Sequence, residues 1–312
     1  MMAQKPTLKK THGQIIAALK AQAARTGEQP NDLYNRFFRE VFLYHLMNRE
    51  DGWVLKGGTN IYCLIPGARH TKDLDLYRRY DPTSAENAVD SLVTSMNGLR
   101  AGSYTFKLEK PERPQATGTV DSRRVNVEVL QGASPRAFVR FSIDVSGDLQ
   151  VTGEVQKLEV TPGFDFSTDL IPPKYDVSSY PVPSQIADKV CAMYELHVDQ
   201  PPGIPSTRYH DLYDVARLAR ELSMSSAELR QALDTQQRVR NMALPERITL
   251  PHENWRTRYP AAAKHFPETS TGWGLDDLDE ALRVVGLLID PVLKGESEHN
   301  DARWDPNNLT WT

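Results

Sequence analysis

Two aspartates separated by a single residue, Asp73 and Asp75, have the types and spacing of residues that do chemistry. On a β-strand, residues two apart point to the same face and lie about 7 Å apart along the chain. Carboxylates held this close repel each other unless a cation lies between them. Mg²⁺ suits such a pair, because it prefers oxygen ligands and bridges substrate phosphates. The alternative is a pair of aspartates on a solvated strand end.

A glycine turn upstream favours the metal site over that alternative. Residues 53–55 are typical of a short buried strand, Gly57 and Gly58 end it, and Thr59 is expected to begin a short helix. Because glycine has no side chain, its backbone N–H groups can come close to a phosphate. The hydroxyl of Thr59 and the helix N-terminus add further donors to this anion site.

A third carboxylate would complete a site for two metal ions. Asp144 alternates with apolar neighbours in the β-type run 137–145, so we expect it on the face opposite the core. A neighbouring strand can present Asp73 and Asp75 beside it. Glu128, which also lies between two valines, is the competing candidate.

The elements that must position these residues change in type along the chain. The first half favours a mixed sheet flanked by helices, and five prolines between residues 161 and 184 indicate a linker without regular structure. Helical periodicity follows it. We therefore predict an N-terminal helical segment (1–30), a sheet-containing domain (31–165), a mainly helical C-terminal domain (166–295) and a polar, loosely held tail (296–312).

The composition limits the class of protein. The chain has 312 residues, of which 39% are hydrophobic and 25% are charged, as in ordinary globular proteins. It contains neither a secretory signal nor an apolar stretch of the roughly 20 residues that a membrane span needs, so we expect a cytoplasmic protein without a membrane partner. Cys63 and Cys191 show neither a metal-ligand spacing nor a disulfide framework.

The second half offers a lysine and a pair of charged residues. Lys189 lies near the middle of an amphipathic helix, where it is either a surface lysine or a point charge that holds a triphosphate across a cleft. Arg208 and Asp211 are three residues apart on a predicted helix and can simply pair with each other.

Together these motifs resemble a known family. The Gly-Gly-Thr turn followed by Asp-Leu-Asp resembles the Gly-Ser…Asp-x-Asp signature of the DNA polymerase β-like nucleotidyltransferase superfamily. Residues 186–192 and 208–214 resemble the lysine-bearing helix and the Arg-x-x-Asp-x-x-Asp element of the AbiEii-type toxins, which include the MenT toxins. The order and spacing agree over about residues 50–220. Thr59 stands where serine is usual, and the interval from Thr59 to Asp73 is longer than in the common signature.

The resemblance implies an α/β nucleotidyltransferase fold with a helix-flanked mixed β-sheet, a mainly helical C-terminal domain, and an active site between the two. It implies that NMP moves from an NTP to an acceptor hydroxyl, with the 3′ end of tRNA as the expected acceptor and a cognate antitoxin as a partner. Asp73, Asp75 and Asp144 would hold two Mg²⁺ ions. The nucleotide would contact Gly57, Gly58, Thr59, Lys189 and Arg208, and Asp211 would orient Lys189 or the nucleotide.

Two other functions remain open. The same chemistry can act on a small molecule or a protein, and a non-enzymatic binding protein can use the carboxylates for a structural cation. The net charge of −4 argues against a dedicated nucleic-acid scaffold, but a local basic face is enough for phosphate contacts. We predict that one continuous face beside the cleft carries Arg78, Arg79, Arg208, Arg238, Arg240, Arg256 and Arg258.

Overall fold

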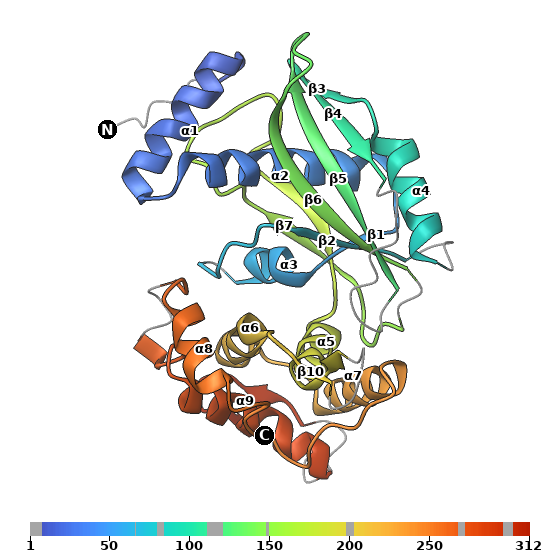
Figure 1. Ribbon diagram of the computed structural model, residues 1–312, viewed down its shortest axis with the longest axis vertical. Helices are drawn as coiled ribbons and strands as arrows, with labels where there is room; N and C mark the ends of the chain where they lie inside the picture. The colour runs from blue at the N-terminus through green and yellow to red at the C-terminus, as the bar shows by residue number, and fades with distance from the viewer. Residues whose placement is uncertain are drawn as a thin grey trace.

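The chain folds into a sheet-containing half and a helical half, which lie next to each other in Figure 1. This computed structural model describes residues 8–65, 67–79, 84–110, 121–147, 150–197, 203–267, 272–295 and 302–312. None of the described helices has the length and apolar character needed to cross a membrane.

The first half is built on a mixed sheet with the strand order β3-β4-β5-β6-β2-β1-β8-β7. Neighbouring strands are antiparallel except for β2 with β6 and β1 with β8, which are parallel. The mixed sheet expected from the sequence is therefore confirmed. Its strands are β1 (Trp53–Lys56), β2 (Leu74–Arg78), β3 (Leu99–Ala101), β4 (Tyr104–Glu109), β5 (Ser122–Gln131), β6 (Ala137–Ser146), β7 (Gln156–Val160) and β8 (Tyr175–Ser179).

One face of this sheet is covered and the other faces the helical half. Helix α2 packs its buried aromatic residues on the covered face, where Phe42 lies 5.9 Å from Phe141 of β6 and 5.8 Å from Phe106 of β4, measured between ring centroids. Alternate residues of β6, such as Ile143, are buried in this core, so the residues between them point to the opposite face. The helices of this half are α1 (His12–Thr26), α2 (Pro30–Arg49), α3 (Gly57–Leu64) and α4 (Ala85–Met96).

The second half has its own hydrophobic core, and α3 connects the two halves. Ile61 of α3 and Ile65 beyond its end are buried in the second core, although α3 follows directly on a strand of the sheet. The helices are α5 (Val182–Tyr194), α6 (Tyr209–Glu221), α7 (Ser226–Val239), α8 (Trp255–Ala263) and α9 (Leu278–Lys294). Two small hairpins pair β9 (Leu196–His197) with β10 (Ile204–Pro205) and β11 (Trp304–Asp305) with β12 (Thr310–Trp311).

The proline-rich segment 161–184 is not an irregular linker, as the sequence led us to expect. It contains β8, which joins the sheet between β1 and β7. The prolines flank this strand instead of interrupting it, and Tyr175 and Val177 enter the core. The last strand of the sheet therefore lies within the segment 166–295 that was expected to be mainly helical.

The end of the chain is also better ordered than a polar tail. Trp304 is 1% exposed, and its indole N–H donates to the carbonyl oxygen of Ala219 over 2.6 Å. The indole N–H of Trp311 donates to the carbonyl oxygen of Leu288 over 3.0 Å. The prediction of a loosely held tail is wrong for residues 302–312, because two tryptophans anchor them to the helices. Residues 296–301 lie outside the described part of the chain.

Candidate active site

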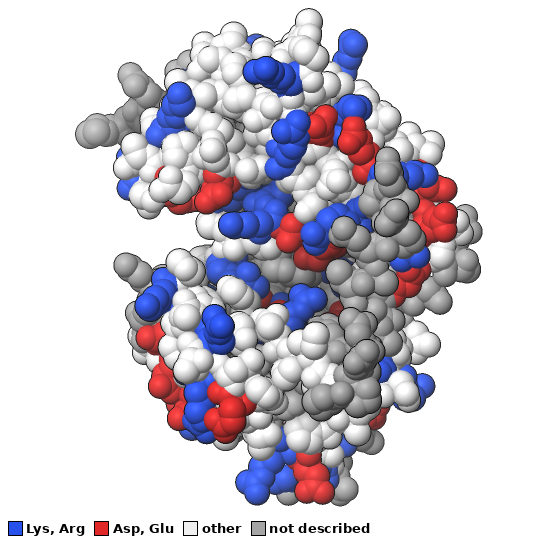
Figure 2. All heavy atoms as spheres, in the orientation of Figure 1, with Lys and Arg blue, Asp and Glu red and all other residues white. Residues whose placement is uncertain are grey.

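An open cleft of about 340 Å³ lies between the sheet face opposite α2 and helices α5 and α6. Figure 2 shows the hollow between the two halves, with both basic and acidic side chains on its walls. The cleft brings together most of the residues that the sequence indicated. It is lined by Gly57, Gly58, Asp73, Asp75, Asp144, Lys189, Arg208 and Asp211.

The register of the strands sets the positions of the carboxylates. Asp73 directly precedes β2, and Asp75 lies opposite Asp144 in the parallel pair of β2 and β6. The leucines on either side of Asp75 are buried in the core, so the two aspartates point toward the cleft. Glu128 lies opposite Arg140, farther along β6. Of the two candidates for a third carboxylate, Asp144 is the one beside Asp75.

Each carboxylate of this group has a distinct environment. The hydroxyl of Ser142 donates to Oδ1 of Asp73 over 2.7 Å. Arg124 donates from Nε and Nη2 to the two oxygens of Asp144, each over 2.8 Å. Burial and then the nearby charge of Asp144 raise the pKa of Asp75 to about 6. Its burial and the neighbouring carboxylate thus both disfavour the charged form of Asp75.

The donor set suits a divalent cation. Carboxylate oxygens are the ligands that Mg²⁺ prefers, and a cation would relieve the repulsion between Asp75 and Asp144. In this conformation, the described part of the chain gathers no group of three His, Cys, Asp or Glu side chains close enough to hold a metal ion. Asp144 is instead paired with Arg124. A cation bound at Asp144 would therefore either share this carboxylate with the guanidinium or displace the guanidinium from it.

The glycine turn is shaped around Asp75. Gly57 has a φ of +62°, and a Cβ atom at this position would lie 2.0 Å from Oδ2 of Asp75. Only glycine allows the junction of β1 and α3 to lie this close to the carboxylate. The side-chain amide of Gln185 on α5 donates to the carbonyl oxygen of Gly57 over 2.8 Å, which ties the turn to the helical half.

The structure corrects the role expected of Thr59. The helix begins at Gly57, so Thr59 lies within its first turn and does not begin it. Its hydroxyl donates to the carbonyl oxygen of Asp73 over 3.2 Å, and Thr59 lines a separate pocket together with Arg39 and Tyr62. Thr59 thus supports the backbone that carries Asp73.

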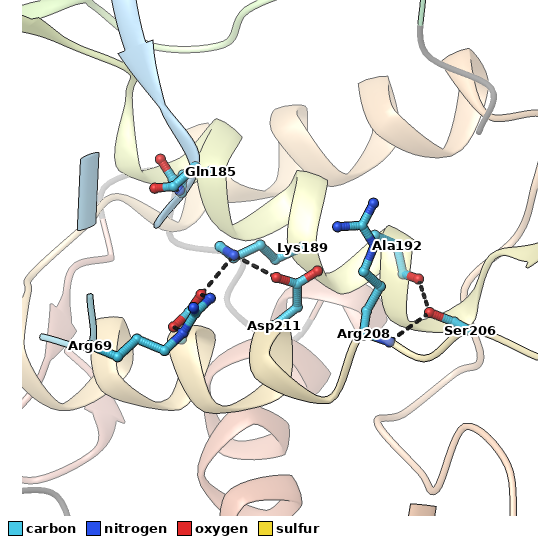
Figure 3. A network of polar contacts seen from close by, with 9 residues as sticks. Arg69, Gln185, Lys189, Ala192, Ser206, Arg208 and Asp211 are labelled. Atoms are coloured by element: carbon cyan, nitrogen blue, oxygen red, sulfur yellow. Dashed lines mark hydrogen bonds and ion pairs between the residues drawn. The ribbon is translucent and has the colours of Figure 1, made fainter. Parts of the chain in front are cut away.

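Lys189 is the centre of a buried ionic network, seen in Figure 3. Its ammonium contacts Oδ1 of Asp211 at 2.5 Å and Oδ2 of Asp214 at 2.8 Å, both on α6. Arg69 binds both oxygens of Asp214, at 2.7 and 2.6 Å. Burial lowers the pKa of Lys189, but Asp211 and Asp214 outweigh it, so the pKa is raised above its ordinary value.

This network excludes two simple structural readings that the sequence left open. Lys189 is 8% exposed, so it is not a solvated surface lysine. Asp211 contacts Lys189 and does not form the simple pair with Arg208 that their spacing allowed. In Figure 3 no interaction joins the guanidinium of Arg208 to the Asp211 carboxylate, and Arg208 lines the cleft.

Sequence reasoning missed several residues of the site. Asp214 was present in the Arg-x-x-Asp-x-x-Asp element, and its position three residues after Asp211 was the available signal. Arg69 and Gln185 carried no comparable signal, because their contacts reach 145 and 128 residues along the chain. Arg124 stood out in the sequence only as part of a basic pair, and its contact with Asp144 depends on the pairing of β5 with β6.

The predicted continuous arginine face is wrong in part. Arg78 lies at the end of β2 remote from Asp75, where it pairs with Glu50 at 2.6 Å and lies 5.1 Å from the Trp53 ring. Arg240 does line the cleft, but it is largely buried and pairs with Glu195 at 2.5 Å. The exposed arginines of the prediction are Arg79, Arg208, Arg238, Arg256 and Arg258.

Comparison with known proteins identifies relatives of this arrangement. The family model described as "Nucleotidyl transferase AbiEii toxin, Type IV TA system" matches residues 41–284. No curated protein matches the chain. Among solved structures, the chain is similar to the MenT4 nucleotidyltransferase toxin of Mycobacterium tuberculosis, with 16% identity and a TM-score of 0.52, covering 86% of this chain and 98% of that one.

Two Helicobacter pylori structures are more distant. JHP933 has 15% identity and a TM-score of 0.39, with 86% of this chain and 95% of that chain covered. A second structure, whose description names a nucleotidyltransferase, has 15% identity and a TM-score of 0.46, with 85% and 97% covered. At such identities a structural likeness concerns the fold alone.

Proposed function

The chain belongs to the AbiEii nucleotidyl transferase toxin family, and from this premise we propose that it moves a nucleoside monophosphate from an NTP to the hydroxyl at the 3′ end of a tRNA. The observation that carries the proposal is that Asp75 and Asp144 lie on neighbouring strands beside the Gly57 turn. The two aspartates line the same cleft as Lys189. These are the acidic and basic groups that nucleotidyl transfer needs.

The basic side of the cleft suits the triphosphate. An ammonium has three N–H donors, and Lys189 uses two of them on Asp211 and Asp214. The third remains for a phosphate oxygen at the cleft. The first N–H groups of α3, at Gly57 and Gly58, lack partners within the helix and add donors at its N-terminus. We assign the β- and γ-phosphates to this side, with Arg208 as a further contact.

The acidic side suits the reacting centre. Asp73, Asp75 and Asp144 would hold two Mg²⁺ ions, which when bound stabilise the attacking and leaving oxygens of an in-line displacement. The acceptor oxygen bonds to the α-phosphorus, and the bond from that phosphorus to the pyrophosphate oxygen breaks. The hydroxyl proton passes to one of these three carboxylates. Asp211 and Asp214 hold Lys189 in place and keep it charged during this step.

Family membership also supports a cognate antitoxin as partner, since the family is one of toxin–antitoxin systems.

The proposal is tested by incubating the protein with total RNA, Mg²⁺ and each α-labelled NTP in turn. Label is expected in tRNA and not in protein, and it should require Mg²⁺. Label in protein or in a small molecule would reject tRNA as the acceptor, and absence of any transfer would reject the enzymatic function.

A further inference from the structure

A second cleft, of about 480 Å³, opens beside the first on the side of helix α2. It shares a border with the first cleft, because Thr71 and Asp73 line both. Its walls come from α2, from the loop before β2, and from the first part of β6. The residues that matter here are Asn35, Arg39, Lys72, Asp73, Arg140 and Ser142.

Strand β6 passes both clefts with one face. Arg140, Ser142 and Asp144 alternate on that face, about 7 Å apart from one to the next. Arg140 and Ser142 line the second cleft and Asp144 lines the first. Ser142 binds the carboxylate of Asp73 at the border. A molecule in the second cleft therefore ends beside a carboxylate that we assign to the reacting centre.

The lining of the second cleft suits a nucleotide. Arg39, Lys72 and Arg140 supply positive charge around the border with Asp73. Arg140 is 70% exposed and uses Nε on Glu128, which leaves its other N–H donors for a phosphate. Asp32 and Asn35 near the start of α2 also line the cleft, and carboxylate and amide groups of this kind can hydrogen-bond base edges. The volume falls in the range of small-molecule sites.

The direction of the reaction places the acceptor here. In an in-line displacement, the attacking oxygen and the leaving pyrophosphate lie on opposite sides of the phosphorus. The proposed triphosphate contacts, Gly57, Gly58 and Lys189, are on the β1 and α5 side of the carboxylates. The attacking hydroxyl must then come from the β6 side, where the second cleft ends at Asp73.

We propose that the second cleft binds the 3′-terminal nucleotides of a single-stranded RNA acceptor, with Lys72 and Arg140 on the phosphates. This inference rests on the proposed function. The terminal hydroxyl loses its proton to the carboxylate group at Asp73 as its oxygen bonds to the α-phosphorus and pyrophosphate leaves.

The test measures binding of a short, fluorescently labelled single-stranded RNA with a free 3′-hydroxyl, by anisotropy at low salt and without NTP. Lys72→Glu and Arg140→Glu should each raise the Kd for this RNA about tenfold, since each reverses a phosphate-binding charge. The control is Arg136→Glu, which makes the same charge change at an exposed residue just before β6, outside both clefts. Arg140→Gln serves as a second variant that avoids repulsion with Glu128.

An RNA affinity that is absent in wild type, or equally reduced in the Arg136→Glu control, overturns this binding site. Binding of the labelled NTP is measured separately for each variant and should not change. If RNA binding depends on Lys72 and Arg140 but wild type transfers no label, the proposed function fails while the RNA site stands.

Discussion

Replacing Asp214 with asparagine removes the negative charge that lies between Lys189 and Arg69. Asp214 is 1% exposed and contacts both cations within 2.8 Å. Breaking a buried ion pair by neutralising one partner destabilises proteins by about 3–5 kcal/mol. Asparagine keeps one acceptor oxygen, and Asp211 still contacts Lys189. We therefore expect the free energy of unfolding to fall by about 3 kcal/mol, near the lower end of this range.

The pH dependence of this loss follows from the pKa of Asp214. Burial raises this pKa, but Lys189 and Arg69 outweigh burial, so the pKa is lowered below its ordinary value. A carboxyl group with a depressed folded-state pKa stabilises the fold above its unfolded pKa of about 3.9, and this stabilisation is lost as the pH falls through the folded-state pKa. The difference between wild type and Asp214→Asn should therefore be constant from about pH 5 to 8 and shrink in stronger acid.

Thermal unfolding followed by circular dichroism measures this effect. The Tm of Asp214→Asn should fall by about 5 °C or more at pH 7. Asp234→Asn is the matched control, because Asp234 is exposed on α7, and its Tm should match that of wild type. A Tm of Asp214→Asn within about 1 °C of wild type would refute the reasoning that this carboxylate stabilises the two buried cations.

Three further predictions concern single positions. Burial raises the pKa of Glu40 to about 7, so the charged form of this carboxyl group opposes folding as the pH rises from about 4.5 to 7. Over that pH range the Tm of Glu40→Gln should rise relative to the Tm of wild type. If the Tm values of the variant and of wild type change with pH in parallel, this prediction is contradicted. Gly57→Ala should lose transfer activity and about 2 kcal/mol or more of stability, because its Cβ would overlap the Asp75 carboxylate. The control Gly13→Ala should fold normally, because a Cβ there meets nothing within 4 Å. An active Gly57→Ala enzyme would contradict the close contact between Gly57 and Asp75. Lys189→Ala should lower kcat/KM at least tenfold, about the effect of one charge-assisted contact, and Lys189→Arg should rescue poorly; wild-type kinetics in Lys189→Ala would remove it from the site.

The sequence predicted the acidic half of the site because strands impose a simple rule. Alternation put Asp73, Asp75 and Asp144 on the face opposite the core, and the structure has them there. The choice between Asp144 and Glu128 needed the register of β5 and β6, which depends on pairing between strands distant in sequence.

The basic half could be predicted only as separate motifs. Lys189 and Asp211 lie on different helices, and their contact depends on how α5 packs on α6. Arg69 reaches Asp214 from 145 residues away, out of a loop that carries no periodic pattern. The fold class is confirmed. Strand β8 was not predicted, because the prolines on either side of it indicated irregular structure more strongly than its two buried residues, Tyr175 and Val177, indicated a strand.

The measurement that tests the central claim most directly is transfer by Asp75→Asn. Asparagine preserves the shape beside Gly57 and removes one of the repelling carboxylates, so the variant should keep the Tm of wild type. With an α-labelled NTP, Mg²⁺ and total RNA, wild type should label tRNA and Asp75→Asn should label none. Asp176→Asn, at an exposed position on β8 of the same sheet, should label it as wild type does. Retained labelling by a folded Asp75→Asn variant would contradict the metal-dependent nucleotidyl transfer proposed for this cleft.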